Sequence, residues 1–161
     1  MGVLTNHDEW KNNAIDFLDK HKNSENRDFI LGYCAHLLTD VYNSENVWTP
    51  FRLKYPHEIE AGRGNLHHIE NNKIDIELAL TYEGRGEFWG HLANSESIDF
   101  LNLIYAAELD IQKDYILNSW YKGKERQDVS ANKIRTYEGE MDFIKKASDF
   151  VFEIFRDKIP K

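Results

Sequence analysis

The sequence has very little cysteine, and this scarcity excludes two kinds of site. Cys34 is the only cysteine among 161 residues, so neither an intrachain disulfide nor a zinc site built on thiolates is available. Long hydrophobic runs are also missing, and residues 1–10 are polar rather than signal-like. We therefore expect a cytoplasmic protein without a transmembrane segment.

Positive charge is in short supply as well. Twenty Lys and Arg residues stand against 28 Asp and Glu residues, which gives a net charge of −8. This balance disfavours a protein that binds duplex nucleic acid, because such a protein needs a basic face to displace counterions. It leaves open a metal enzyme that acts on a phosphate ester, since the bound ion supplies the local positive charge.

Strand-like alternation is absent, whereas apolar residues recur at the three- and four-residue spacing of helices. We predict one all-α domain over residues 1–161, a bundle of about five helices. Asn6 and Glu9 form a capping box at the first helix, and Ser95 or Ser97 and Ser130 are the expected caps of the last two. Residues 42–64, which contain Pro50 and Pro56, are expected to be a long irregular loop. The five helices are expected at about 6–20, 28–43, 65–82, 95–121 and 131–158.

His36 and Asp40 are the two polar residues on an otherwise apolar stripe of the helix over 28–43. They are four residues apart, so they point the same way, one turn from each other. If that stripe is buried, an imidazole and a carboxylate there need partners. A metal ion would satisfy both, and a hydrogen bond between His36 and Asp40 within the core is the alternative.

Further metal ligands are needed, because a zinc site takes three or four nitrogen or oxygen ligands. His7 precedes the first helix, which a short turn joins to the helix over 28–43, so it is the natural third ligand. His68 or His67, together with Asp75, would add ligands from the helix over 65–82. His67 and His68 are adjacent, so at most one of them faces inward.

Catalytic and substrate-binding roles fall on residues near these ligands. Glu45 and Asp75 are candidates for the general base. The loop over 42–57 would form the rim of the site, with Trp48 lining it and Arg52 pairing with a phosphate oxygen.

A resemblance to a known family supports the metal site. Residues 29–33, Phe-Ile-Leu-Gly-Tyr, lead into residues 36–40, His-Leu-Leu-Thr-Asp. This run resembles the zinc-dependent phospholipase C-like family, a helical fold shared with single-strand nucleases, in which an aliphatic-Gly-Tyr run precedes a zinc-binding His-x-x-x-Asp. The family's bacterial members also tend to have a His before the preceding helix, as at His7, and an aromatic-rich segment after the Asp, as here.

The resemblance covers about residues 6–51, and the chain departs from the family pattern at two places. It has no Asp upstream of His7, and no later His-x-x-x-Glu pair, because Asn71 stands four residues after His67. The resemblance therefore implies a divergent or truncated member with a reduced zinc site, made of His7, His36 and Asp40, with Asp75 or His68 added.

The leading hypothesis is a Zn²⁺-dependent hydrolase whose substrate is a small phosphate ester or a phospholipid headgroup. The second is a non-catalytic domain of the same fold that has lost the metal and has a binding or structural role. The third is an interaction module in which the aromatic residues around Trp48 bind a partner protein.

Overall fold

The computed structural model describes residues 6–60, 65–102, 104–156 and 158. This described part is all-helical, with one isolated β-bridge between Phe100 and Ile104 and no strand, which confirms the predicted all-α class. The chain divides into two compact units, Met1–His67 with Glu138–Lys161, and His68–Tyr137. Within the described residues, no helix combines the length and apolar character needed to cross a membrane.

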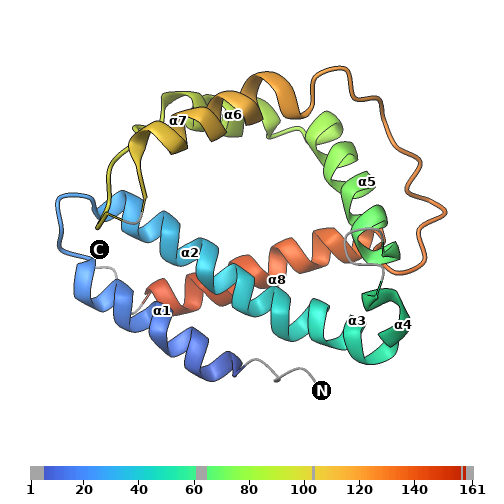
Figure 1. Cartoon of the computed structure of the whole chain (residues 1–161), viewed down its shortest axis with the longest axis horizontal. Coiled ribbons are helices and arrows are strands. Elements are labelled where there is room, and N and C mark those ends of the chain that lie inside the picture. Colours follow the sequence, from blue (N-terminus) through green and yellow to red (C-terminus); the bar gives the residue numbers. More distant parts are fainter. Residues whose placement is uncertain (1–5, 61–64, 103, 157, 159–161) are drawn as a thin grey trace. The chain divides into compact units, whose positions relative to one another are not determined.

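The first unit is built on α1 (His7–His21), α2 (Arg27–Asn43) and α8 (Tyr137–Arg156). The first two form an antiparallel hairpin joined by a short turn, as Figure 1 shows. Their bounds lie within a residue of the prediction. At the start of α1, the side chain of Asn6 accepts a hydrogen bond from the backbone N–H of Glu9, which confirms the predicted cap.

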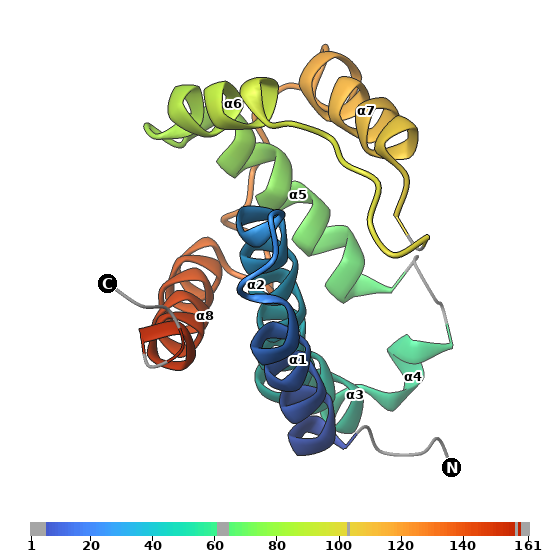
Figure 2. The ribbon, with the colours of Figure 1, turned by 90° about the vertical axis from the view of Figure 1, so that its left-hand side faces the viewer.

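The core of this unit lies between α1 and α2, and α8 covers α2 from another side. Ala14 and Leu18 of α1 are buried together with an aliphatic stripe of α2 that contains Ile30, Cys34, Leu38 and Val41. Tyr42 contacts Phe143 and Phe150 of α8, with ring centroids 6.0 and 5.4 Å apart, so α8 runs beside α2 (Figure 2).

The predicted long loop after α2 is wrong over most of its length. The chain continues through a π-helical turn, η1 (Ser44–Trp48), into α3 (Thr49–Lys54) and α4 (Pro56–Ile59). Pro50 and Pro56 each occupy the first turn of a helix, where the missing N–H has no partner to lose, so here proline begins helices rather than breaking them. Residues 61–64 of that predicted loop lie outside the described residues.

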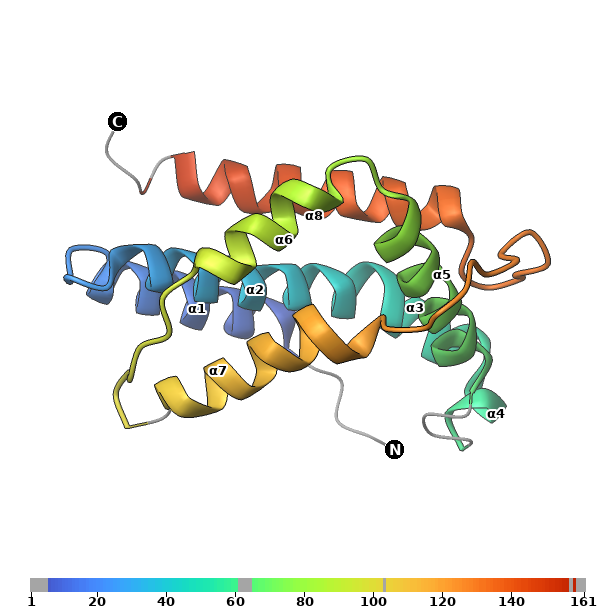
Figure 3. The same ribbon diagram turned by 90° about the horizontal axis from the view of Figure 1, so that it is seen from above.

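The second unit contains α5 (Leu66–Thr81), whose first two residues belong to the first unit, α6 (Arg85–Asn94) and α7 (Ala106–Tyr115). A π-helical turn, η3 (Ile116–Trp120), extends α7. The prediction for α5 is confirmed. The helix expected over 95–121 begins instead at Ala106, and residues 95–102, which follow α6, are not helical (Figure 3).

The helix expected from residue 131 also begins later, at Tyr137. Ser130 does not cap it. The backbone N–H and the hydroxyl of Ser130 both donate to the carboxylate of Asp128, which holds a local turn instead. The backbone amides of residues 133–135 donate to Glu70 of α5 in place of helical hydrogen bonds.

Candidate functional site

His36 and Asp40 form a pair on the surface of α2. The Nε2 atom of His36 lies 3.4 Å from Oδ2 of Asp40, and their side chains are 70% and 45% exposed. The prediction that the two lie on a buried stripe is therefore wrong, although the predicted proximity of one helical turn is confirmed.

The reason is a rotation of α2 relative to the predicted stripe. The expected stripe contained Phe29, Tyr33, Leu37 and Asp40, but the hairpin with α1 buries the residues one position further along, at 30, 34, 38 and 41. Cys34 lies at the centre of this contact, where its thiol donates to the backbone oxygen of Ala14 over 3.8 Å. Burial raises the pKa of the Cys34 thiol to about 11, because a buried site disfavours the charged thiolate.

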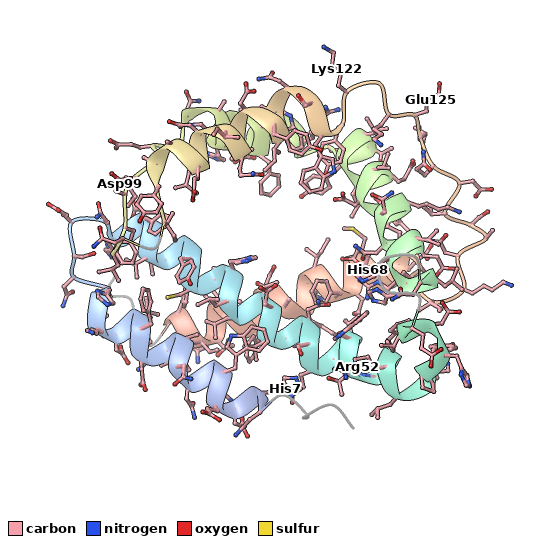
Figure 4. The ribbon with its side chains drawn as sticks, in the orientation of Figure 1. His7, Arg52, His68, Asp99, Lys122 and Glu125 are labelled. Atoms are coloured by element: carbon pink, nitrogen blue, oxygen red, sulfur yellow. The ribbon has the colours of Figure 1, made fainter. Side chains whose placement is uncertain are left out.

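His7, the first residue of α1, contacts the chain one turn beyond Asp40. Its Nε2 atom is 3.0 Å from Oγ of Ser44, and Ser44 follows Asp40 by four residues. His36, Asp40 and Ser44 therefore line one side of the chain at successive turns, with the ring of His7 against the last of them. Figure 4 labels His7 at the first turn of α1.

The distance within the pair fits a shared ion. In a tetrahedral zinc site with bonds of about 2.0–2.2 Å, two ligand atoms lie roughly 3.3–3.6 Å apart. The 3.4 Å between His36 and Asp40 matches one edge of such a tetrahedron. Over the residues that the structure describes, no three His, Cys, Asp or Glu side chains are gathered closely enough to hold one ion, so two of the predicted ligands are brought together and His7 stays at the neighbouring turn.

A second exposed pair of the same type lies on α6. The Nε2 atom of His91 is 3.6 Å from Oε1 of Glu87, with both side chains more than three-quarters exposed. The spacing of histidine and carboxylate by one turn is thus not special to α2. His91 gives an internal comparison for any test of the α2 pair.

The two adjacent histidines of α5 differ in burial, as the sequence predicts. His67 is buried, with its ring 5.2 Å from that of Trp48 and 4.8 Å from that of Phe51. His68 is exposed and belongs to the second unit. Trp48, expected on the rim of a loop, instead packs against the rings of Phe51 and His67 within the first unit.

The predicted catalytic residues have different surroundings. Glu45 is exposed on η1, and Arg52 is half-buried on α3 (Figure 4). Asp75 lies in the second unit, where its carboxylate accepts a hydrogen bond of 2.9 Å from the hydroxyl of Tyr121. Burial of Tyr121, and then the negative charge of Asp75, raise the pKa of that phenol.

Sequence reasoning missed two buried carboxylates of α5. Glu70 accepts hydrogen bonds from the backbone N–H groups of Lys133, Ile134 and Arg135 at 2.7, 2.7 and 2.8 Å. Burial alone would raise the pKa of Glu70, but these three donors outweigh it and hold the pKa below its ordinary value. No local pattern announces this, because the donors lie 63 to 65 residues away.

Glu77 is the second of these carboxylates. It accepts from the guanidinium of Arg126 and, at 2.9 Å, from the backbone N–H of Gln127. The hydrogen bond from Arg126 lowers the pKa of Glu77, with that of Gln127 adding to it. The sequence hints at their burial only through spacing, because Glu70 and Glu77 lie seven residues apart on either side of Ile74, which is buried.

Neither a family model, nor a curated protein, nor a solved structure matches this chain.

Proposed function

We propose that the protein is a Zn²⁺-dependent hydrolase of phosphate esters, small or carried on a phospholipid headgroup, with its metal held at the exposed face of α2. The observation that carries the proposal is the separation of 3.4 Å between a histidine nitrogen and a carboxylate oxygen, both open to solvent. The resemblance of residues 29–40 to the zinc-dependent phospholipase C-like family supports it.

In this proposal His36 and Asp40 hold the ion, and His7, whose ring contacts Ser44 one turn beyond Asp40, is the third ligand. Held there, zinc would supply a bound water with its pKa lowered to about 7, able to attack a phosphate ester at neutral pH. The exposure of the pair leaves room for a substrate. Ser44 fixes the ring of His7 through the 3.0 Å hydrogen bond, and so acts as a positioning residue.

The test compares variants of the α2 pair with a variant of His91, whose exposure is similar to that of His36. Zinc bound per chain is measured by elemental analysis after dialysis, together with the dissociation constant for Zn²⁺ and the hydrolysis of bis(p-nitrophenyl) phosphate. We expect His36→Ala and Asp40→Ala to weaken zinc binding at least about tenfold. Loss of a residue that only hydrogen-bonds to a metal ligand already costs about that much, and loss of a ligand itself should cost more. His91→Ala, which removes the ring of the α6 pair, should leave binding and hydrolysis unchanged.

A wild-type protein that binds no zinc would contradict the proposal, as would equal losses in His36→Ala and His91→Ala. Binding of zinc without hydrolysis would contradict the enzymatic part alone. Chelation should abolish hydrolysis, and added Zn²⁺ should restore it.

One observation favours the second candidate, a non-catalytic domain with a binding or structural role. His36 and Asp40 already lie 3.4 Å from each other, and an exposed pair of this kind needs no metal. In that case His36→Leu should leave the free energy of unfolding unchanged within about 0.5 kcal/mol, as is usual at exposed positions, and zinc should not raise the melting temperature of the wild type.

A further inference from the structure

Residues 122–136 of the second unit, here called the strap, join η3 to α8 without a helix of their own. The strap runs past α5 (Figure 1), and Figure 4 labels Lys122 and Glu125 near its start. Arg135 is its one residue in the buried class, and the others are exposed or half-buried. Because so little apolar surface is covered, hydrogen bonds and ion pairs hold the strap in place.

Glu70 is the anchor at the end of the strap. A single carboxylate receives three consecutive backbone N–H groups, from Lys133, Ile134 and Arg135, all within 2.8 Å. The side chain of Asn132 reinforces the same turn by donating to the backbone oxygen of Arg135 at 2.8 Å. Charge-assisted bonds of this kind are about twice as strong as neutral ones.

Glu77 is the anchor near the start of the strap. It takes Nε of Arg126 and the backbone N–H of Gln127, both at 2.9 Å. Glu70 and Glu77 are two turns apart, so both carboxylates face the same side of α5. Between the two anchors the strap makes a local turn, in which Ser130 bonds to Asp128.

We propose that the strap is a latch, opening and closing as one unit on two carboxylates while the helices on either side stay folded. Each anchor holds neighbouring residues of the strap through one carboxylate: Glu70 holds three backbone N–H groups, and Glu77 holds a guanidinium and one backbone N–H. The bonds at each anchor are therefore lost together. The stretch between the anchors has little burial of its own to keep it closed. Segments with few buried apolar contacts open locally at a lower free energy than the core.

Limited trypsin digestion of the full chain, followed by mass spectrometry, tests this coupling. Arg126 reports on the Glu77 end, and Lys133 on the Glu70 end. We expect Glu70→Gln to raise cleavage after Arg126 about tenfold, and Glu77→Gln to raise cleavage after Lys133 by a similar factor, because opening at either end frees the whole strap. Glu125→Gln makes the same charge change within the strap and should have no effect.

Cleavage confined to the end whose anchor was changed would overturn the proposal, and so would unchanged cleavage in both variants. Cleavage after Lys11 of α1 must stay at the wild-type level, because an increase there would mean that the variant unfolds globally. Native-state hydrogen exchange of the wild type gives a second measurement without mutation. The amides of residues 127 and 133–135 should exchange with one common opening free energy, below that of α1 and α8, and different opening free energies at the two anchors would refute the latch.

Discussion

Leu101 has a backbone conformation that suits glycine better than leucine. Its φ is 50°, and that of Asn102 is 56°. Asn tolerates this left-handed region, whereas a branched apolar side chain there costs about 1–2 kcal/mol. Because Leu101 is 53% exposed, little burial offsets that cost.

We therefore expect Leu101→Gly to stabilise the protein by about 0.5–1 kcal/mol, after allowing for the greater entropy of glycine in the unfolded chain. The measurement is the urea midpoint of unfolding. Leu53→Gly is the matched control, because Leu53 is 73% exposed but lies in α3. That variant should lose about 1 kcal/mol, the usual cost of glycine in a helix. A lower midpoint for Leu101→Gly would show that the leucine side chain stabilises the turn.

For His36, the sequence predicts the contact with Asp40 but not the exposure of the side chain. The four-residue spacing fixes the contact with Asp40, because that depends only on helical geometry. Which face of α2 is buried depends on the partner helix, and the small side chains of Ala14 and Cys34 allow α1 to approach on another side. That choice is a matter of tertiary packing, which the periodicity of α2 alone does not contain.

At the scale of elements, the cap of α1 is set by local sequence. Asn6 accepts from the N–H of Glu9 at 3.2 Å. Removing this acceptor in Asn6→Ala should destabilise the protein by about 1 kcal/mol. Urea unfolding followed by circular dichroism measures the loss. Asn13→Ala, at an exposed position within the same helix, should be neutral or slightly stabilising, since alanine has the higher helix propensity. Equal losses in both variants would argue against capping as the cause.

The helices α1, α2 and α5 could be predicted closely because caps and apolar spacing are local. The start of α8 could not. Residues 133–135 carry no helix-breaking proline or glycine, and their amides are diverted by Glu70 from 63 to 65 residues away. Likewise, proline breaks a helix when it lies inside one but is tolerated in the first turn. The sequence alone favours a break at Pro50 and Pro56, whereas both lie in the first turn of a helix.

At the scale of the molecule, the described residues form two compact units. One all-α domain over residues 1–161 stays a prediction, as do the hydrolase activity and the zinc. The all-α class is confirmed. Apolar periodicity is enough to predict a class, but it does not determine how the helices pack.

Both units contain carboxylates that make the protein sensitive to acid. Hydrogen bonds from Lys158 and Lys22 lower the pKa of Asp19 in the first unit, and those described above lower the pKa of Glu70 and Glu77 in the second. A carboxylate with a lowered pKa binds fewer protons folded than unfolded. Its contribution is therefore fully present above the ordinary pKa and is lost as the pH falls through the lowered value.

We expect the free energy of unfolding to be nearly constant from pH 7 to about 5 and to fall below about 4.5, where unfolded Asp and Glu begin to take up protons. Urea titrations at a series of pH values measure this. The double variant Glu70→Gln, Glu77→Gln should be less stable at pH 7 and should show a shallower fall in acid. A fall of wild-type steepness in that variant would mean that other groups cause the acid sensitivity.

Because Cys34 is buried, the native protein should not react with thiol-directed dyes. It is the sole thiol in the sequence, it has no solvent-accessible surface, and its pKa of about 11 leaves almost no thiolate at neutral pH. A cysteine introduced at exposed Lys122 would then take up a maleimide fluorophore alone, without removal of the native residue. The fluorescence of such a label would report how often the strap, residues 122–136, opens.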